Sequence, residues 1–204
     1  MKIIRLLIAD ITLGFKHRSF LLKNISEEQR EKVLAFKNEK DQARSLISAY
    51  LINSLSNEKV MKKCMGKPYF ENGPYFNVSH SGQYIVMAIS ENEVGVDIEE
   101  NVEKDMSSLV RIFNETEAKM IKEHADFYYL WCAKESLIKC FGGSVGQIKE
   151  VPSLPLNGLK TFKGKDYQSQ TFLFDKHIIS ITNESKEPFE VKIEKVDRIP
   201  YKIK

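Results

Sequence analysis

Two acidic residues stand one position apart in the stretch 94–99, whose other residues are apolar or glycine. If this stretch is a strand, Asp97 and Glu99 point to the same side as Gly95, and the valines and isoleucine point to the other. Two strand rises separate the acids by roughly 7 Å. Carboxylate oxygens suit Mg²⁺, which also takes phosphate oxygens and water. The pair is therefore a candidate magnesium site, although a solvated face of a two-sided strand gives the same pattern.

A second group of charged residues lies in the stretch 127–141, where apolar residues recur at helical spacing. Lys134 falls inside this apolar stripe, and a lysine in such a place usually reaches an anion or extends to the surface. Glu135 and Lys139 are i,i+4 neighbours on the flank of the stripe. Taken alone, that pair reads as a surface ion pair.

Further polar residues have a simple structural interpretation when each is taken alone. The stretch Ser79–Gly82 is rich in turn-forming residues, so His80 reads as a surface loop histidine. Lys67 and Pro68 belong to a predicted turn, and Arg44 lies on the solvated face of a predicted helix.

The elements that must position these residues alternate between helix and strand. A first strand is expected within the first ten residues, followed by two helices in 26–56, broken near Asn38 and capped by Ser26. A hairpin is expected over 75–90 with its turn at Ser79–Gly82, and a strand over 94–99. Two helices are then expected, over 110–124 and 126–143, the second ended by glycine. The remaining segments are predicted strands: 160–164, 167–175, 177–183 and 189–197.

The chain shows a hint of internal duplication. The segments 74–90 and 168–183 have similar apolar alternation, and each follows a helical region. This pattern predicts an α+β fold in which two similar halves, 1–93 and 94–204, form a pseudo-dimer with the active site in the cleft between them.

Composition excludes several classes of protein. The 204 residues carry a net charge of +3 and are 42% hydrophobic, which fits a globular protein with a sizeable core and does not favour nucleic-acid binding. The three cysteines form no C-x-x-C pair, which favours a reducing cytoplasm. No apolar run approaches the length of a membrane span, and the short N-terminal run reads as a strand rather than a signal peptide.

The order of the motifs is more specific than any one of them. Gly66-Lys67-Pro68, Phe76-Asn77-Val78-Ser79-His80-Ser81-Gly82, Gly95-Val96-Asp97-Ile98-Glu99 and Trp131-Cys132-Ala133-Lys134-Glu135-Ser136-Leu137-Ile138-Lys139 follow one another. This order resembles the 4′-phosphopantetheinyl transferases, in particular the type that activates surfactin synthetase. The resemblance implies transfer of the phosphopantetheine arm of coenzyme A (CoA) to a serine of an acyl or peptidyl carrier protein, with release of adenosine 3′,5′-bisphosphate.

The resemblance also implies roles for particular residues. Mg²⁺ would be held by Asp97, Glu99 and Glu135, and Glu135 and Lys139 would be catalytic. CoA would be bound by Lys32, Arg44, Lys67, Pro68, Ser79, His80, Lys134 and Lys139. The family often has a lysine where this chain has Gln29, so one contact to the 3′-phosphate of CoA is expected to be missing.

Three further expectations complete this interpretation. The internal pseudo-dimer favours a monomer, and neither nucleic acid nor a membrane is an expected partner. The alternative function is a non-catalytic CoA- or nucleotide-binding module on the same fold.

Overall fold

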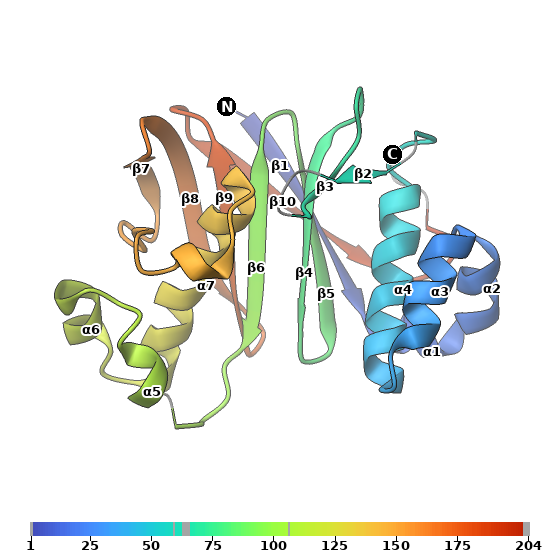
Figure 1. Cartoon of the computed structure of the whole chain (residues 1–204), viewed down its shortest axis with the longest axis horizontal. Coiled ribbons are helices and arrows are strands. Elements are labelled where there is room, and N and C mark those ends of the chain that lie inside the picture. Colours follow the sequence, from blue (N-terminus) through green and yellow to red (C-terminus); the bar gives the residue numbers. More distant parts are fainter. Residues whose placement is uncertain (1, 59, 63–65, 106, 202–204) are drawn as a thin grey trace.

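The structure, a computed structural model, describes residues 2–58, 60–62, 66–105 and 107–201. Two four-stranded sheets form its centre (Figure 1). The first has the order β10 (Phe189–Val196), β1 (Lys2–Asp10), β5 (Tyr84–Ser90) and β4 (Tyr75–Ser81). The second has the order β6 (Val94–Glu100), β9 (His177–Glu184), β8 (Lys165–Phe174) and β7 (Gly158–Phe162). The predicted α+β fold class is confirmed.

Helices lie on the outer sides of the two sheets, as Figure 1 shows at its right and left. Beside the first sheet lie α1 (Thr12–Lys16), α2 (Arg18–Lys23), α3 (Glu27–Ala35) and α4 (Glu39–Asn53). Beside the second lie α5 (Ser107–Val110), α6 (Glu115–Met120), α7 (His124–Phe141) and the short 3₁₀ helix η1 (Val145–Gln147). A two-stranded piece, β2 (Met61–Lys62) with β3 (Pro68–Tyr69), completes the described elements.

Apolar side chains from both sheets meet in one buried cluster. Its members come from β1, β5, β6, β9 and β10 and include Ile4, Leu6, Val86, Val94, Val96, Ile98, Ile179 and Phe189. Separate clusters fill the space between each sheet and its own helices. Strands β1 and β5 are thus buried on both faces over most of their length, which explains their near-continuous apolar sequences.

Most of the predicted elements are present, and their ends follow the expected capping residues. Ser26 caps α3 through a capping box with Gln29, and Asn38 caps α4. Gly142 ends α7 in the left-handed region at φ 74°, a conformation that glycine adopts without strain. All six strands expected outside the first hairpin lie in the sheets, although β10, from the predicted second half, joins the first sheet parallel to β1.

Two expectations about local structure were wrong. The turn of the first hairpin is at Gly82 and Gln83, so Ser79, His80 and Ser81 belong to strand β4. The helix expected over 110–124 is divided, because Asn114 caps a new helix, α6, part-way along it. Among the described residues, no helix has both the length and the apolar character that crossing a membrane requires.

Candidate active site

Strand β6 and helix α7 bring the predicted acidic residues together. Val94, Val96 and Ile98 are fully buried in the cluster between the sheets, so the alternation expected for this strand is confirmed. On the opposite face α7 passes very close to Gly95. A Cβ atom at that position would lie 2.0 Å from the carbonyl oxygen of Ser136. Glycine is therefore required at position 95 for the helix to approach the strand that carries the acids.

The acids line a cavity of about 250 Å³, which we call the acid cavity. Its walls are formed by Val78, Ser79, His80, Asp97, Glu99, Trp131, Glu135 and Lys139. Asp97 and Glu135 are only 3% and 8% exposed. The Lys139 amine lies 2.6 Å from Asp97 Oδ1 and 3.9 Å from Glu135 Oε2. The i,i+4 pair on α7 is thus part of a larger cluster rather than an isolated surface pair.

Two serines of β4 hold the carboxylates of β6. The Ser79 hydroxyl donates to Asp97 Oδ1 at 2.9 Å, and the Ser81 hydroxyl donates to Glu99 Oε2 at 2.8 Å. The Lys139 amine donates to Ser79 Oγ at 3.0 Å. The other oxygen of Asp97, Oδ2, is buried and accepts no hydrogen bond from the described residues. A buried carboxylate oxygen without a donor is costly, and a bound cation would satisfy it.

The charges in the acid cavity shift the pKa values of its members. Burial, and then the negative charge of Asp97, raises the pKa of both Glu99 and Glu135. Burial acts to lower the pKa of Lys139, but the charge and the hydrogen bond of Asp97, together with the charge of Glu135, raise it overall. Three acids with one lysine leave an excess of negative charge, and a cation would relieve it.

A second cavity, of about 580 Å³, lies beside α3 and α4. Lys32 and Pro68, both predicted to bind CoA, are among its lining residues, together with Gln29, Ser45, Ser48 and Asn53. The Gln29 side chain is engaged within the chain, with Ser26 and Asn53. Lys32 forms an exposed ion pair with Glu28. Five of the eight predicted CoA residues therefore lie in two cavities: Lys32 and Pro68 in this one, and Ser79, His80 and Lys139 in the acid cavity.

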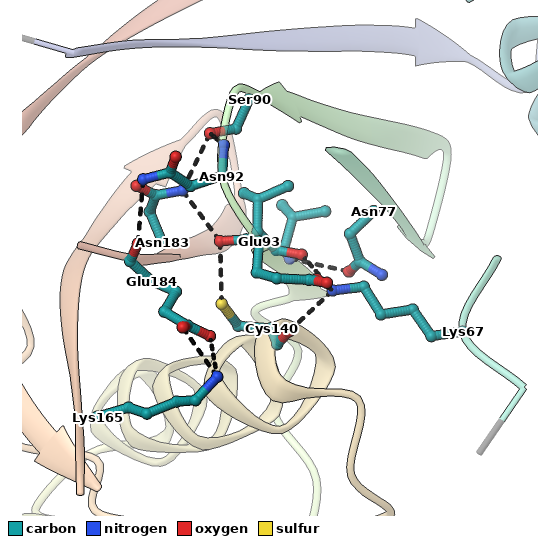
Figure 2. A network of polar contacts seen from close by, with 11 residues as sticks. Lys67, Asn77, Ser90, Asn92, Glu93, Cys140, Lys165, Asn183 and Glu184 are labelled. Carbon is teal, nitrogen blue, oxygen red and sulfur yellow. Dashed lines mark hydrogen bonds and ion pairs between the residues drawn. The ribbon is translucent and has the colours of Figure 1, made fainter. Parts of the chain in front are cut away.

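Arg44 and Lys67, also predicted to bind CoA, contact the chain itself and are not among the residues that line these cavities. Arg44 pairs with Asp41 at 2.9 Å and donates to the carbonyl of Gly82 at 2.5 Å. The Lys67 amine donates to Glu93 and to the carbonyls of Val94 and Cys140, each at 2.8–2.9 Å (Figure 2). It thereby joins the segment before β3 to the start of β6 and the end of α7.

Lys134 lies outside the acid cavity although it precedes Glu135 in the chain. It is 1% exposed, and its amine lies 3.0 Å from Glu117 Oε2 of α6. The same amine donates to the carbonyl of Val151. The predicted anion partner of this buried lysine is therefore a carboxylate of the chain. A further cavity, of about 740 Å³, is lined by Arg5, Lys192, Glu194, Asp197, Arg198, Pro200 and Tyr201, and none of the predicted site residues is among them.

Comparison with known proteins places these motifs in a family. A model described as the 4′-phosphopantetheinyl transferase superfamily matches residues 93–184. The 4′-phosphopantetheinyl transferase Sfp of Bacillus subtilis is 31% identical over 185 residues, which cover 82% of this chain and 80% of Sfp. The chain belongs to the 4′-phosphopantetheinyl transferase superfamily.

Other members are similar over different lengths. The 4′-phosphopantetheinyl transferase Gsp of Aneurinibacillus migulanus is 34% identical over 139 residues, which cover 61% of this chain and 59% of Gsp. The mouse L-aminoadipate-semialdehyde dehydrogenase-phosphopantetheinyl transferase is 25% identical over 185 residues, covering 76% of this chain and 60% of the mouse protein. The expected resemblance, including the surfactin-activating type, is confirmed.

The acid cavity of this transferase suits a divalent cation in the chemistry of its donors. Three carboxylates line it, and the Oδ2 atom of Asp97 is buried without a donor among the described residues. Across those same residues, no three His, Cys, Asp or Glu side chains stand at the spacing of a metal site. The Lys139 amine lies among the acids instead, 2.6 Å from Asp97 Oδ1.

Sequence reasoning missed two polar residues that connect β4 to β6, one through an acid of the site and one through the backbone. Ser81 bonds to Glu99, and Asn77 accepts from the backbone N–H of Val96 at 2.9 Å. Both belong to the same motif as Ser79. The signal was present, because residues 77, 79 and 81 share one face if the segment is a strand. Its turn-forming composition masked this alternation.

Proposed function

We propose that this transferase moves the 4′-phosphopantetheine group of CoA to a serine hydroxyl of an acyl or peptidyl carrier protein, releasing adenosine 3′,5′-bisphosphate. The observation that carries the proposal is the convergence of Asp97, Glu99, Glu135 and Lys139 in one cavity of a chain of this family. The alternative, a non-catalytic CoA-binding module, gains no support from the relatives, which are named as transferases.

In this proposal Asp97, Glu99 and Glu135 hold Mg²⁺. The ion would offset the negative charge of the CoA diphosphate, which otherwise repels a nucleophile. The buried Oδ2 atom of Asp97 supports this assignment, because it would gain the partner that it lacks within the described chain. The excess of carboxylates over lysines in the acid cavity supports it as well.

Two residues of α7 act on the reacting atoms. A serine hydroxyl is a weak nucleophile and needs a base, and the Glu135 carboxylate lines the cavity beside Lys139. Its carboxylate accepts the hydroxyl proton. Lys139 has a raised pKa and so keeps its positive charge. Its amine donates to the phosphate oxygens of the leaving group as negative charge develops there.

Some of the remaining predicted residues keep the proposed CoA-binding role, and others favour a structural role. Ser79 and His80 line the acid cavity, and Lys32 and Pro68 line the cavity beside α3 and α4, so these four keep the proposed role. Arg44, Lys67 and Lys134 have internal partners, which favours a structural role for them. We further propose a cytoplasmic monomer; the buried Cys132 thiol, which is in no disulfide, suits a reducing compartment. Cys64 lies outside the described residues.

A transfer assay tests the proposal. The full chain is incubated with CoA, Mg²⁺ and a panel of apo-carrier proteins of fatty-acid, polyketide and nonribosomal-peptide synthesis, and each carrier is weighed by mass spectrometry. We expect a phosphopantetheine adduct on the carrier serine, lost with EDTA and restored by Mg²⁺. CoA binding without an adduct on any carrier would favour the non-catalytic module.

A further inference from the structure

Strands β4 and β6 lie side by side at the ends of their two sheets, and side chains rather than a backbone ladder connect them. In the order of the sheets, β4 ends one and β6 ends the other. Asn77, Ser79 and Ser81 occupy alternate positions of β4 and all reach β6. We call these three residues the β4 comb. Figure 2 shows Asn77 with its side-chain oxygen directed at the backbone of β6.

The members of the comb make different kinds of contact. Asn77 accepts from the backbone N–H of Val96, which has no carboxylate. Ser79 and Ser81 each donate to a side-chain carboxylate. Asn77 thus contacts only the backbone of β6, whereas Ser79 and Ser81 also act on the acids.

Each serine hydroxyl has a fixed orientation, because a hydroxyl has a single proton to donate. Ser81 accepts from the backbone N–H of Glu100 at 3.0 Å, so its proton is directed to Glu99 Oε2. Ser79 accepts from the amine of Lys139, so its proton is directed to Asp97 Oδ1. In both acids one oxygen is held by β4 and the other is left for a different partner.

We propose that Ser81 is a positioning residue for the cation site: it holds Glu99 in the conformation that accepts a divalent ion, as Ser79 does for Asp97. This inference rests on the proposed function. Glu99 has several rotatable bonds, and fixing one of its oxygens in advance reduces the entropy that ion binding must otherwise overcome. Hydrogen-bond partners of metal ligands commonly change metal affinity by about 10- to 100-fold.

The test measures binding of Mn²⁺ alone to the full chain, by electron paramagnetic resonance of the free ion. We expect Ser81→Ala to raise the dissociation constant about 10- to 100-fold. Ser81→Thr, which keeps the hydroxyl, should restore it to within a few-fold of wild type. Asn77→Ala is the matched control, because it removes a contact of the comb that touches no acid. It should lower thermal stability and leave Mn²⁺ affinity nearly unchanged.

A double variant makes the test specific for Glu99. In a Glu99→Gln background, Ser81→Ala should cause no further loss of Mn²⁺ affinity, because the carboxylate on which it acts is gone. An unchanged affinity in Ser81→Ala would overturn the inference while leaving the proposed function intact. An equal loss in Asn77→Ala would also overturn it, because the effect would then be general loosening of β4. A wild-type chain that binds no Mn²⁺ yet modifies carriers would overturn the inference and the cation site, but not the transfer.

Discussion

Two clusters of charged side chains contact helix α7, and they differ in whether their hydrogen bonds are complete. The acid cavity contains Asp97, Glu99, Glu135 and Lys139. The second cluster, which we call the buried ion cluster, contains Glu117, Lys134 and Lys160, each no more than 3% exposed. Lys134 and Glu135 are neighbours in sequence, but one residue turns the helix by about 100°, so they serve different clusters.

In the buried ion cluster each charged group has its partners. Glu117 accepts from the backbone N–H and the hydroxyl of Ser153, at 2.9 and 2.6 Å, and from Lys134. The Lys160 amine donates to the carbonyl of Ser153 at 2.7 Å. In the acid cavity, by contrast, Asp97 Oδ2 has no partner among the described residues. Acidic residues and lysines thus stabilise the fold in the buried ion cluster. In the acid cavity they leave a carboxylate oxygen available to a ligand.

The largest expected effect on activity concerns the acid cavity. Asp97→Ala should reduce the rate of transfer roughly 10³-fold or more, because the site loses a carboxylate that would bind the cation and balance its charge. The alternation of β6 is kept, so the far-UV circular dichroism spectrum should not change. Asp166→Ala, which removes a strand aspartate outside the cavity, is the control and should leave the adduct rate at the wild-type value. A fully active Asp97→Ala chain would contradict the metal assignment.

Substitutions in the buried ion cluster should change the free energy of unfolding rather than the rate of transfer. Lys134→Met leaves Glu117 buried without its ion partner, which typically costs about 3–5 kcal/mol in the free energy of unfolding. Guanidinium denaturation measures this loss. The double variant Lys134→Met/Glu117→Gln should regain part of it, because no unpaired charge stays buried.

The same variant separates the two roles considered for Lys134. If the lysine instead binds CoA, Lys134→Met should weaken CoA binding with little loss of stability. Isothermal titration of the folded protein with CoA decides between these outcomes.

The contrast between the clusters shows how far sequence alone could go. The alternation in 94–99 and the helical stripe in 127–141 are local patterns, so the faces of β6 and α7 could be predicted correctly. The partner of Lys134 could not, because Glu117 lies on another helix and only packing brings the two together. The same is true of Lys67, whose three acceptors come from β6, its preceding residue and the end of α7.

Two further misses also arise from contacts between segments that are distant along the chain. Ser79 and Ser81 have the composition of a turn, yet their pairing with β5 and their bonds to β6 extend the strand to Ser81. Long-range pairing overrode local propensity there. The place of β10 beside β1 depends on contacts between the two ends of the chain, which no local pattern encodes.

A pH-dependent stability test sharpens the comparison further. Burial lowers the pKa of Lys160 from its ordinary value of 10.5 to about 7, although the charge of Glu117 opposes this. Between about pH 7 and 10.5 the unfolded chain binds the proton more tightly than the folded chain. The contribution of Lys160 to the free energy of unfolding should therefore rise with pH across this window.

Lys160→Met isolates that contribution. The stability of the variant relative to wild type should be higher at pH 6 than at pH 10. At pH 6 the folded wild type must either bury a protonated amine or release its proton, and the variant avoids both costs. Denaturation curves at both pH values measure the difference. The same difference between variant and wild type at the two pH values would show that Lys160 is not buried as described.

The smallest effect is expected for an exposed ion pair of the same chemistry as the buried one. Lys32 and Glu28 pair across one turn of α3 with side chains 52% and 71% exposed, so their pair should contribute less than about 1 kcal/mol to stability. Lys32→Ala should nevertheless raise the dissociation constant for CoA by roughly 3- to 10-fold at low salt and less at high salt, because an exposed charge is screened. Lys23→Ala on α2 is the control. If both substitutions change CoA affinity equally, the effect is one of net charge, and the cavity beside α3 and α4 is not where CoA phosphates bind. If only Lys32→Ala weakens CoA binding, the difference in exposure explains why Lys32 binds a ligand while the buried Lys134 stabilises the fold.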